Sequence, residues 1–450
     1  MLGLAYKTNK TTYKCLLFLG IMAAIFVAPI PTWAAETLVN TETSDSQNYP
    51  AIARDSAGNF VITWHSLGQD GSSYGVFGQR FNSSGVAQGL EFQVNTYSTG
   101  QQGNASVAMD PDGGFVVAWQ SEGQDSGVSW GVYAQRFLAD GSPAGSEFQV
   151  NTTTPSQQAM PQVAMDSTGN FLIVWQGLGS DDNYGIHARR YDYSGSPLAS
   201  EFLVHEITVA IESAPSIAMD PNGNFIVTWE RDDTDGSGKG VYARRFNSSG
   251  VSQGAEFLVN TTTTNDQENP NIAVDQDGDF VIVWEDLGAD GALEGAFGQR
   301  YNAAGASQGG EFQINTTTAS NQQNPSVGMD PGGNFFVIWD SEAQDGDNLG
   351  VFGREYNYLG VAQGGEFQVN TTTAGVQTGG NNSVIGNSEG SWIIGWAGQG
   401  TGDTIGVFYD TFTSSESADL RLVKTVDDAN PIEGGTVVYT LTISNLGPTD

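Results

Sequence analysis

The sequence predicts an all-β protein: a seven-bladed β-propeller followed by the start of a β-sandwich domain. A phrase close to Glu-Phe-Gln-Val-Asn-Thr recurs seven times, about every 55 residues. The same three further phrases follow each copy in the same order. The first and last copies are out of phase, since the chain opens with a lone copy of the phrase at Glu36 and its last repeat ends at Phe412 without one.

Each repeat contains four strand-like segments. One segment ends in an Asp or Asn, and a Trp follows nine residues later, as in Asp110 and Trp119. The turn between them, Asp-Pro-Asp-Gly-Gly, has the chemistry of a type I turn closed by a left-handed glycine, which predicts a hairpin of 107–109 with 115–119. The third strand reads Gly-Val-Phe-x-Gln-Arg-Phe at 75–81, and the repeated phrase supplies the fourth. Four short antiparallel strands make one propeller blade.

The offset between the first and last copies predicts how the ring closes. The lone strand at Glu36 completes the last blade as its outer strand, which a linear β-solenoid, the alternative architecture, does not require. Ala53, Ala108 and their equivalents suit a crowded innermost strand that lines the channel. We therefore expect the propeller to span residues 36–412.

The N-terminal residues 1–35 have the pattern of a signal peptide. Lys7, Lys10 and Lys14 precede an apolar run, and Ala34 and Ala35 offer a cleavage site. We expect an exported protein, extracellular or in the cell envelope, with no membrane insertion of the mature chain; an uncleaved anchor is the alternative. Cleavage would also remove Cys15, the only cysteine.

The charge of the chain excludes some partners. A formal net charge of −35 opposes binding to nucleic acid or to anionic lipid. It favours divalent cations wherever carboxylates converge.

Two resemblances add to this interpretation. The propeller segment resembles the Glu-Phe-Gln-Val-Asn-Thr repeats of large secreted bacterial proteins, which often lie beside calcium-dependent adhesin modules. This resemblance implies a cell-surface or extracellular setting and no catalytic activity. The tail, residues 413–450, opens with Asp-Leu-Arg-Leu-Val-Lys and ends in Ser-Asn-Leu-Gly-Pro. It resembles the immunoglobulin-like repeat of unknown function found in tandem in bacterial surface proteins, and we expect a linker and an incomplete domain of that kind.

The candidate metal ligands are aspartates in the loop six residues after each Trp, with Asp403 displaced by one position. They are Asp70, Asp125, Asp181, Asp235, Asp290 and Asp345. These carboxylates could hold Ca²⁺, the one cofactor expected here, or the Asp-Gly pairs could simply make turns. Tyr74 and Trp130 lie in the same loops and are candidate ligand contacts. The repeated Trp residues are expected to pack the blades, and Arg80 is expected to pair with Glu91.

No catalytic constellation stands out. The first hypothesis is therefore a non-catalytic binding or adhesion module for a surface polysaccharide or protein, with calcium as its candidate stabilising ion. A glycan hydrolase or lyase is the second; it would use the irregular fourth repeat, with Glu206, Asp232 and Asp233. A structural spacer is the third.

Overall fold

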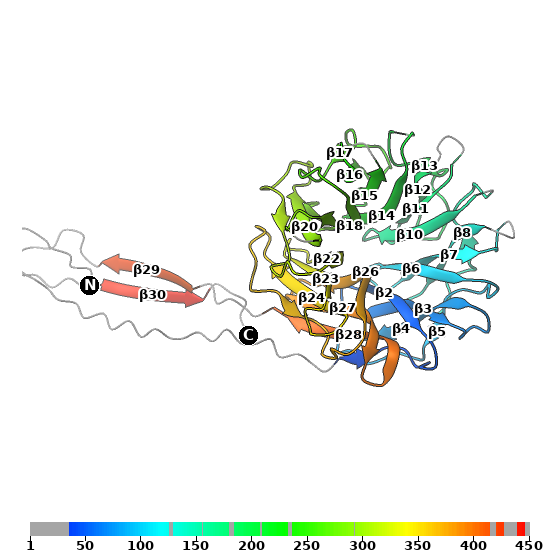
Figure 1. Cartoon of the computed structure of the whole chain (residues 1–450), viewed down its shortest axis with the longest axis horizontal. Coiled ribbons are helices and arrows are strands. Elements are labelled where there is room, and N and C mark those ends of the chain that lie inside the picture. The colour runs from blue at the N-terminus through cyan, green and yellow to red at the C-terminus, as the bar shows by residue number, and fades with distance from the viewer. Residues whose placement is uncertain are drawn as a thin grey trace, which may run out of the picture. The chain divides into compact units, whose positions relative to one another are not determined.

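The computed structural model describes residues 36–125, 129–154, 156–179, 184–207, 209–232, 236–291, 293–414, 420–426 and 439–445. In this part of the chain every regular element is a β-strand, and strands β1 to β28 form seven antiparallel sheets of four strands each. The sheets follow one another around a ring in chain order (Figure 1). The predicted seven-bladed β-propeller is confirmed.

The innermost strands contact one another around the whole ring. They are β2 (Gln47–Arg54), β6 (Gln102–Met109), β10 (Gln158–Met165), β14 (Glu212–Met219), β18 (Gln267–Val274), β22 (Gln322–Met329) and β26 (Gln377–Gly386). They lie close together: a Cβ on Gly328 would come within 2.5 Å of the Val384 carbonyl oxygen of the next blade. A larger residue would not fit at Gly328, which confirms there the prediction that the crowded innermost strand needs small residues.

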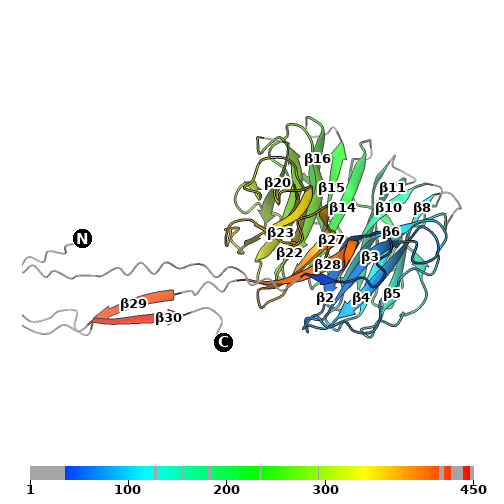
Figure 2. The same cartoon turned by 60° about the horizontal axis from the view of Figure 1, so that its bottom comes forward.

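Each innermost strand pairs with a second strand that carries the repeated Trp. The second strands are β3 (Phe60–Leu67), β7 (Phe115–Glu122), β11 (Phe171–Gly177), β15 (Phe225–Asp232), β19 (Phe280–Leu287), β23 (Phe335–Glu342) and β27 (Ser391–Gly400). The third strands are β4 (Tyr74–Phe81), β8 (Trp130–Phe137), β12 (Gly185–Tyr191), β16 (Lys239–Phe246), β20 (Glu294–Tyr301), β24 (Leu349–Tyr356) and β28 (Asp403–Thr413). Within each blade the strands stand side by side (Figure 2).

The outer strand of each blade is only two residues long. These strands are β5 (Phe92–Gln93), β9 (Phe148–Gln149), β13 (Phe202–Leu203), β17 (Phe257–Leu258), β21 (Phe312–Gln313), β25 (Phe367–Gln368) and, for the last blade, β1 (Thr37–Leu38). We number the blades from blade 1 (β2–β5) to blade 7 (β26–β28 with β1). Thr37 lies opposite Tyr409 and Leu38 opposite Phe408, so the N-terminal strand closes the ring as predicted.

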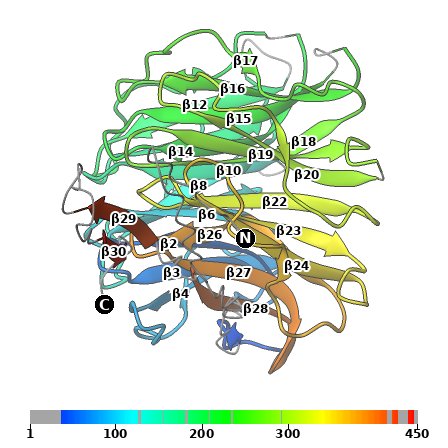
Figure 3. The ribbon, with the colours of Figure 1, turned by 90° about the vertical axis from the view of Figure 1, so that its left-hand side faces the viewer.

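Seen from the side, the blades lie next to one another (Figure 3). They pack through seven apolar clusters, each shared between neighbouring blades. The Trp of each second strand is almost wholly buried in one of them. Every residue of β11 is buried, as expected for a strand covered on both faces. The prediction that the repeated Trp residues pack the blades is confirmed.

The Glu of the repeated phrase joins each blade to the one before it. Glu91 of blade 1 accepts hydrogen bonds from the backbone N–H of Thr41 (2.6 Å) and from its Oγ1 (2.9 Å). Glu36 of blade 7 makes the equivalent contact with Thr371 Oγ1 (2.8 Å) and Thr372 Oγ1 (2.6 Å) of blade 6. The contact that spans the two ends of the ring therefore has the same chemistry as the others.

The Asn of the same phrase connects three backbone segments. Asn40 Oδ1 accepts from the Val407 N–H (2.7 Å), and its Nδ2 donates to Asp403 Oδ2 (2.8 Å) and Gln47 Oε1 (3.3 Å). Asn95, Asn260 and Asn370 make the corresponding bonds to the third strand and to the next blade.

The expected ion pair between Arg80 and Glu91 was wrong. Arg80 Nη1 donates to the Ala139 carbonyl oxygen in a turn of blade 2 (2.8 Å), whereas Glu91 bonds to Thr41. Arg80 and Glu91 are neighbours within one blade, but in the folded ring a turn of the next blade brings the Ala139 carbonyl oxygen within hydrogen-bond distance of the guanidinium.

The tail contains one described hairpin, in which β29 (Leu420–Val426) pairs antiparallel with β30 (Tyr439–Asn445). The expected signal peptide and most of the expected immunoglobulin-like segment lie outside the described residues. Within the described part of the chain there is no helix of the length and hydrophobicity needed to cross a bilayer.

Deleting residues 36–40 should open the ring. The deletion removes the burial of Val39, about 2 kcal/mol, and several blade-to-blade hydrogen bonds, each about 1 kcal/mol. We therefore expect the free energy of unfolding, measured by urea titration, to fall by at least about 4 kcal/mol. Truncation after residue 414 is the control, because it leaves all seven blades whole. An unchanged urea midpoint for the deletion would show that β1 does not close the ring.

Candidate functional site

The central channel is crossed by the side chain of Asn382. Its Nδ2 donates to Gln162 Oε1 of blade 3 (2.6 Å), and its Oδ1 accepts from Asn271 Nδ2 of blade 5 (3.3 Å). Asn382 can reach across because β26 has a longer bulge, from Gly379 to Val384, than the other innermost strands. This bridge divides the channel into two openings, which we call the turn mouth and the loop mouth.

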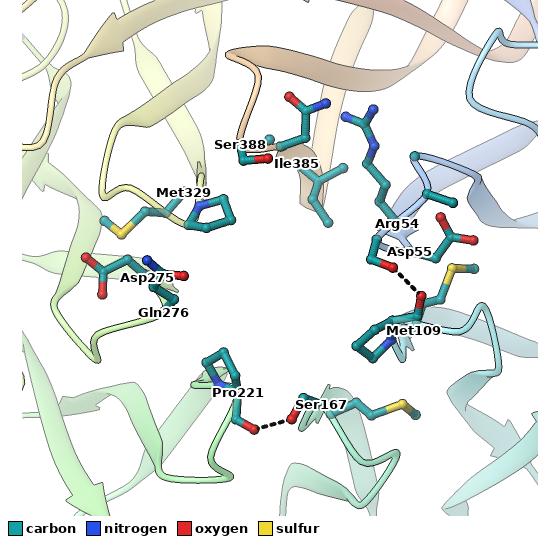
Figure 4. A pocket seen from close by; sticks show the side chains of 18 of the residues that line it. Arg54, Asp55, Met109, Ser167, Pro221, Asp275, Gln276, Met329, Ile385 and Ser388 are labelled. Carbon is teal, nitrogen blue, oxygen red and sulfur yellow. Dashed lines mark hydrogen bonds between the residues drawn. The ribbon is translucent and has the colours of Figure 1, made fainter.

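The turn mouth lies on the side of the hairpins between first and second strands, and it contains a cavity of about 750 Å³. Figure 4 shows Met109, Met329, Ile385 and Arg54 around this opening. The predicted hairpin turns form its rim. Asp275 Oδ1, for example, accepts from the backbone N–H groups of Asp277 and Asp279 (both 2.9 Å), an Asx turn in place of a calcium loop. Carboxylates of this rim are used in turns, so the cavity of the turn mouth presents few free acidic groups to a ligand.

The loop mouth lies on the opposite side, where the third residue of each innermost strand has a left-handed backbone. These residues are Tyr49, Asn104, Met160, Ala214, Asn269, Asn324 and, in the longer bulge, Asn382, with φ between 49° and 60°. Each lies in a β-bulge. Non-glycine residues in this conformation are uncommon, and they concentrate at functional sites.

The residue after each buried Trp reaches toward these bulges. Gln120 Oε1 accepts from the Met160 N–H (3.0 Å), Gln176 Oε1 from the Ala214 N–H (2.8 Å) and Glu230 Oε2 from the Asn269 N–H (3.2 Å). In blades 5 and 6 the position holds Glu285, which bonds to Asn324, and Asp340, which bonds to the Gly379 N–H (2.7 Å). The ring position is therefore neutral in blades 1–3 and acidic in blades 4–6.

These acids form part of what we call the acidic arc: Glu230, Glu268, Glu285, Glu294 and Asp340. Glu268, Glu285 and Glu294 each place one carboxylate oxygen within 4.8 Å of the others, the one group of this kind among the described residues. Lys239 Nζ lies 2.9 Å from both Glu230 Oε1 and Glu268 Oε2.

Burial changes the protonation of the acidic arc. It raises the pKa of Glu285 to about 7 and that of Asp340 to about 8, although both accept hydrogen bonds. Burial and the negative charge of Glu268 also raise the pKa of Glu294. Burial opposes the charge of Lys239, but its two carboxylate partners raise its pKa overall. The arc thus combines carboxyls that keep their protons near neutral pH with a carboxylate pair held by an ammonium group.

Aromatic side chains lie at this mouth in blades 1–3, and we call Tyr49, His65, Tyr74, Trp130 and Tyr184 the aromatic arc. His65 is at the position of Glu285, the three side chains at or just before the start of the third strands are at the position of Glu294, and Tyr49 is at the position of Asn269. The His65 ring centroid lies 5.0 Å from that of Tyr49 and 4.6 Å from that of Tyr74. Burial lowers the pKa of His65 to about 4, so its ring is neutral at neutral pH. Tyr184 accepts a hydrogen bond from Gln176 (3.1 Å). Tyr74 and Trp130, the predicted ligand contacts, are both half-buried at the start of third strands.

The loop aspartates predicted as metal ligands are distributed one to a blade. Asp70 Oδ1 and Asp345 Oδ1 accept from the backbone N–H two residues on (both 3.1 Å), which is turn geometry, whereas the Oδ2 atom of each is buried without a hydrogen bond. Asp125 lies 3.4 Å from Gln149 Nε2, and Asp290 lies 3.2 Å from Asn315 Nδ2. Asp181 and Asp235 are outside the described residues. Calcium binding by these loops stays a prediction.

The irregular fourth repeat holds a buried charge network. Arg231 Nε lies 2.7 Å from Glu212 Oε1, and Arg231 Nη1 lies 2.7 Å from Glu256 Oε1. His205 Nδ1 approaches Glu212 at 3.6 Å. Burial opposes ionisation of Arg231, but both glutamates raise its pKa overall. In blade 1 the same three positions hold Asn40, Gln47 and Ser66, so the three changes compensate one another.

Of the residues expected to act in catalysis in this repeat, Glu206 Oε1 pairs with Arg244 Nη2 (2.6 Å). Asp232 ends β15, opposite Lys239 on β16. Asp233 is outside the described residues. Sequence analysis missed the acidic arc, although one signal was present: the residue after the repeated Trp changes from His or Gln to Glu or Asp at blade 4.

Comparison with known proteins supports the fold. No protein-family model matches the chain, and no curated sequence does. An ulvan lyase from a new family of polysaccharide lyases superposes with a TM-score of 0.54 at 11% identity, over 82% of this chain and 94% of the other. An α-L-arabinofuranosidase from Fusarium graminearum gives 0.50 at 12% identity, over 73% and 99%. A protein of unknown function from Dyadobacter fermentans gives 0.50 at 10% identity, over 86% and 100%.

The charge network of blade 4 predicts a large effect of Arg231→Ala. The substitution leaves Glu212 buried without its cation, so we expect the free energy of unfolding to fall by about 3–5 kcal/mol. Replacing all three residues by those of blade 1 (His205→Asn, Glu212→Gln, Arg231→Ser) should recover most of this loss, because it removes the fully buried charges of Glu212 and Arg231 together and leaves Glu256 bonded to the Glu206 N–H. Both variants are measured by urea unfolding, and a triple variant as unstable as Arg231→Ala would contradict the network.

The protonation of Asp340 predicts a pH dependence of stability. The folded state keeps this proton up to about pH 8, whereas the unfolded chain loses it near the ordinary pKa of 3.8. The unfolded state therefore binds fewer protons between these values, and the free energy of unfolding falls as the pH rises through them. Asp340→Asn should flatten this fall when melting temperatures are compared from pH 5 to pH 8, and Asp347→Asn, at an exposed carboxylate, should not. Parallel curves for Asp340→Asn and the native chain would refute the assignment.

Proposed function

We propose that the protein cleaves a neutral glycan at the loop mouth, acting outside the cell after export. The observation that carries this proposal is the division of the mouth into an aromatic arc and an acidic arc on an otherwise regular ring. Aromatic rings provide apolar faces of the kind on which sugars stack, and carboxyl pairs are the usual groups of glycoside hydrolysis. A module that serves only as a spacer has no need for either.

Roles within the acidic arc follow from environment. Glu294 is half-buried with a raised pKa, which suits a general acid. We assign the nucleophile to Glu268, the half-buried carboxylate paired with Lys239. Glu285 is buried and bonds to Asn324 and to Asn269 Nδ2 (3.1 Å), so we assign it the positioning of these two bulges.

The spacing of the carboxyls favours one stereochemical course. Retaining glycosidases place their two carboxyls about 5–5.5 Å apart, and inverting ones about 6.5–9.5 Å. In the acidic arc, one carboxylate oxygen of Glu268 lies within 4.8 Å of one carboxylate oxygen of Glu294, which is nearer to the retaining value. In that course Glu268 would attack the anomeric carbon while Glu294 protonates the leaving oxygen. Water, activated by Glu294, would then release the sugar.

Charge limits the substrate class. The acidic arc, on a chain of net charge −35, would repel a polysaccharide rich in carboxylates or sulfates. A lyase must neutralise the carboxylate of its substrate, and Lys239, the cation that contacts the arc among the described residues, already has two glutamate partners. Hydrolysis of a neutral chain is therefore favoured over lyase chemistry. An arabinofuranosidase and an ulvan lyase on related rings support glycan cleavage in general without deciding between the two.

The test is a screen of neutral polysaccharides, including arabinan, for release of reducing ends. Glu294→Gln and Glu268→Gln should each lower the rate by about 10²–10⁴ while glycan binding persists, because the acid and the nucleophile act on the bond and not on affinity. Tyr74→Ala should weaken glycan binding, measured by calorimetry. Tyr193→Ala, at an exposed tyrosine in a turn on the other side of the ring, is its matched control.

Three outcomes are informative. Cleavage that depends on both glutamates supports the proposal. Glycan binding that depends on Tyr74 without any cleavage would replace it by a non-catalytic adhesion module. The absence of both glycan binding and cleavage would overturn the proposal.

A further inference from the structure

Blade 5 departs from the repeat at two positions that surround the glutamate of its outer strand, Glu311. The second residue after the Trp is Asp286, where blades 1, 2 and 6 have Ser66, Ser121 and Ser341. Three residues later blade 5 has Ala289, where the same blades have Gln69, Gln124 and Gln344. One change adds a carboxylate, and the other removes an amide.

The glutamine has a defined role in the regular blades. Gln344 Nε2 donates to Glu366 Oε1 (3.0 Å), and Gln69 and Gln124 bond to their own glutamates in the same way. Ala289 has no such donor. Glu311 keeps its bonds to Thr261 and Thr262 of blade 4, but the group that faces it from its own loop is missing.

The added carboxylate is buried without compensation. Asp286 has no solvent exposure, and neither of its oxygens has a hydrogen-bond partner of normal geometry, although Gln267 and the Ala289 N–H lie nearby. The negative charges of Glu311 and Asp290 are near enough to disfavour its ionised form further. Residues 287–293, the loop above it, contain no Lys, Arg or His. Burial and the charge of Glu311 raise the pKa of Asp286 to about 7, so at higher pH its carboxylate is charged and needs a cation beside it.

Blade 4 shows what satisfies the same position. There the residue equivalent to Asp286 is Arg231, whose guanidinium lies between Glu212 and Glu256, the equivalents of Gln267 and Glu311. In blade 4 a cationic side chain therefore contacts the outer-strand glutamate. In blade 5 the positive side chain is replaced by a negative one, and Ala289 has no amide at the position of the glutamine.

We propose that blade 5 binds a single Ca²⁺ ion between Asp286 and Glu311, beside Ala289. Two carboxylates neutralise a divalent charge, and Asp290 adds a further negative charge nearby. All the available donors are oxygens, which hard cations prefer. Calcium is favoured over magnesium because it accepts an irregular set of oxygen ligands, whereas magnesium requires near-octahedral geometry. This site differs from the predicted ring of loop aspartates, since it exists in one blade only.

The experiment uses the 450-residue chain, freed of metal with EGTA and titrated with CaCl₂ at pH 8. Calorimetry should give one ion per chain, and the melting temperature should rise with saturation, because the ion binds the folded state. Mg²⁺ at the same concentration should not reproduce the shift.

Two substitutions locate the site. Asp286→Ser and Ala289→Gln restore the residues of the regular blades, so both variants should fold. Asp286→Ser should abolish the calcium response, and in EGTA it should melt above the native chain because the unpaired carboxylate is gone. Ala289→Gln should weaken the response, because its amide fills the space of the ion and donates to Glu311. Asp345→Asn, in the loop of blade 6, is the control and should leave the affinity unchanged.

The proposal fails if calcium does not bind, or if it binds equally well to Asp286→Ser. It also fails if several ions bind and Asp345→Asn reduces their number, because that result would assign calcium to the loop aspartates.

Discussion

The propeller depends on one contact repeated around the ring: the glutamate at the start of each outer strand bonds to the end of the outer-strand phrase of the preceding blade, which supplies Thr everywhere except in blade 3, where Glu206 stands. Glu91 makes this contact with Thr41, and Glu36 makes it with Thr371 and Thr372 across the two ends of the ring. Because β1 completes blade 7, the sheet series ends without a free blade edge, which would otherwise expose unpaired backbone groups. Without a cysteine in the described ring, these polar contacts and the Trp-centred clusters hold the blades together.

A regular frame of this kind makes each departure from the repeat informative. In blade 4 three substitutions together replace a neutral hydrogen-bonded set by the buried charges of His205, Glu212 and Arg231. In blade 5 the same position holds Asp286 with no cationic side chain facing it. An ionised group in the interior needs a partner of opposite charge. Two neighbouring copies of the repeat therefore differ in the sign of the side chain at one buried position, Arg231 in blade 4 and Asp286 in blade 5.

The two mouths of the channel differ in what they offer to a ligand. The turn mouth contains the larger cavity, but its aspartates are used in Asx turns and its lining is rich in methionine. At the loop mouth, left-handed bulges bring unlike side chains toward the axis, and burial separates the protonation states of Glu285, Glu294 and Asp340 from those of ordinary carboxyls. Chemistry at a single point needs unlike groups, so the asymmetric mouth is the better candidate.

The sequence by itself determined the repeat length, the four strands of a blade, the hairpin turns and the offset of Glu36, because each depends on local residue order. It also placed Tyr74 and Trp130 beside the loops that follow the repeated Trp, where the structure has them half-buried; their contact with a ligand stays a prediction. Only the tertiary structure decided what lies across a blade boundary: that Arg80 bonds to the next blade and not to Glu91, and that Glu268, Glu285 and Glu294 converge. These contacts depend on how adjacent blades are rotated and on bulges at residues such as Asn269, which no local pattern in one repeat specifies.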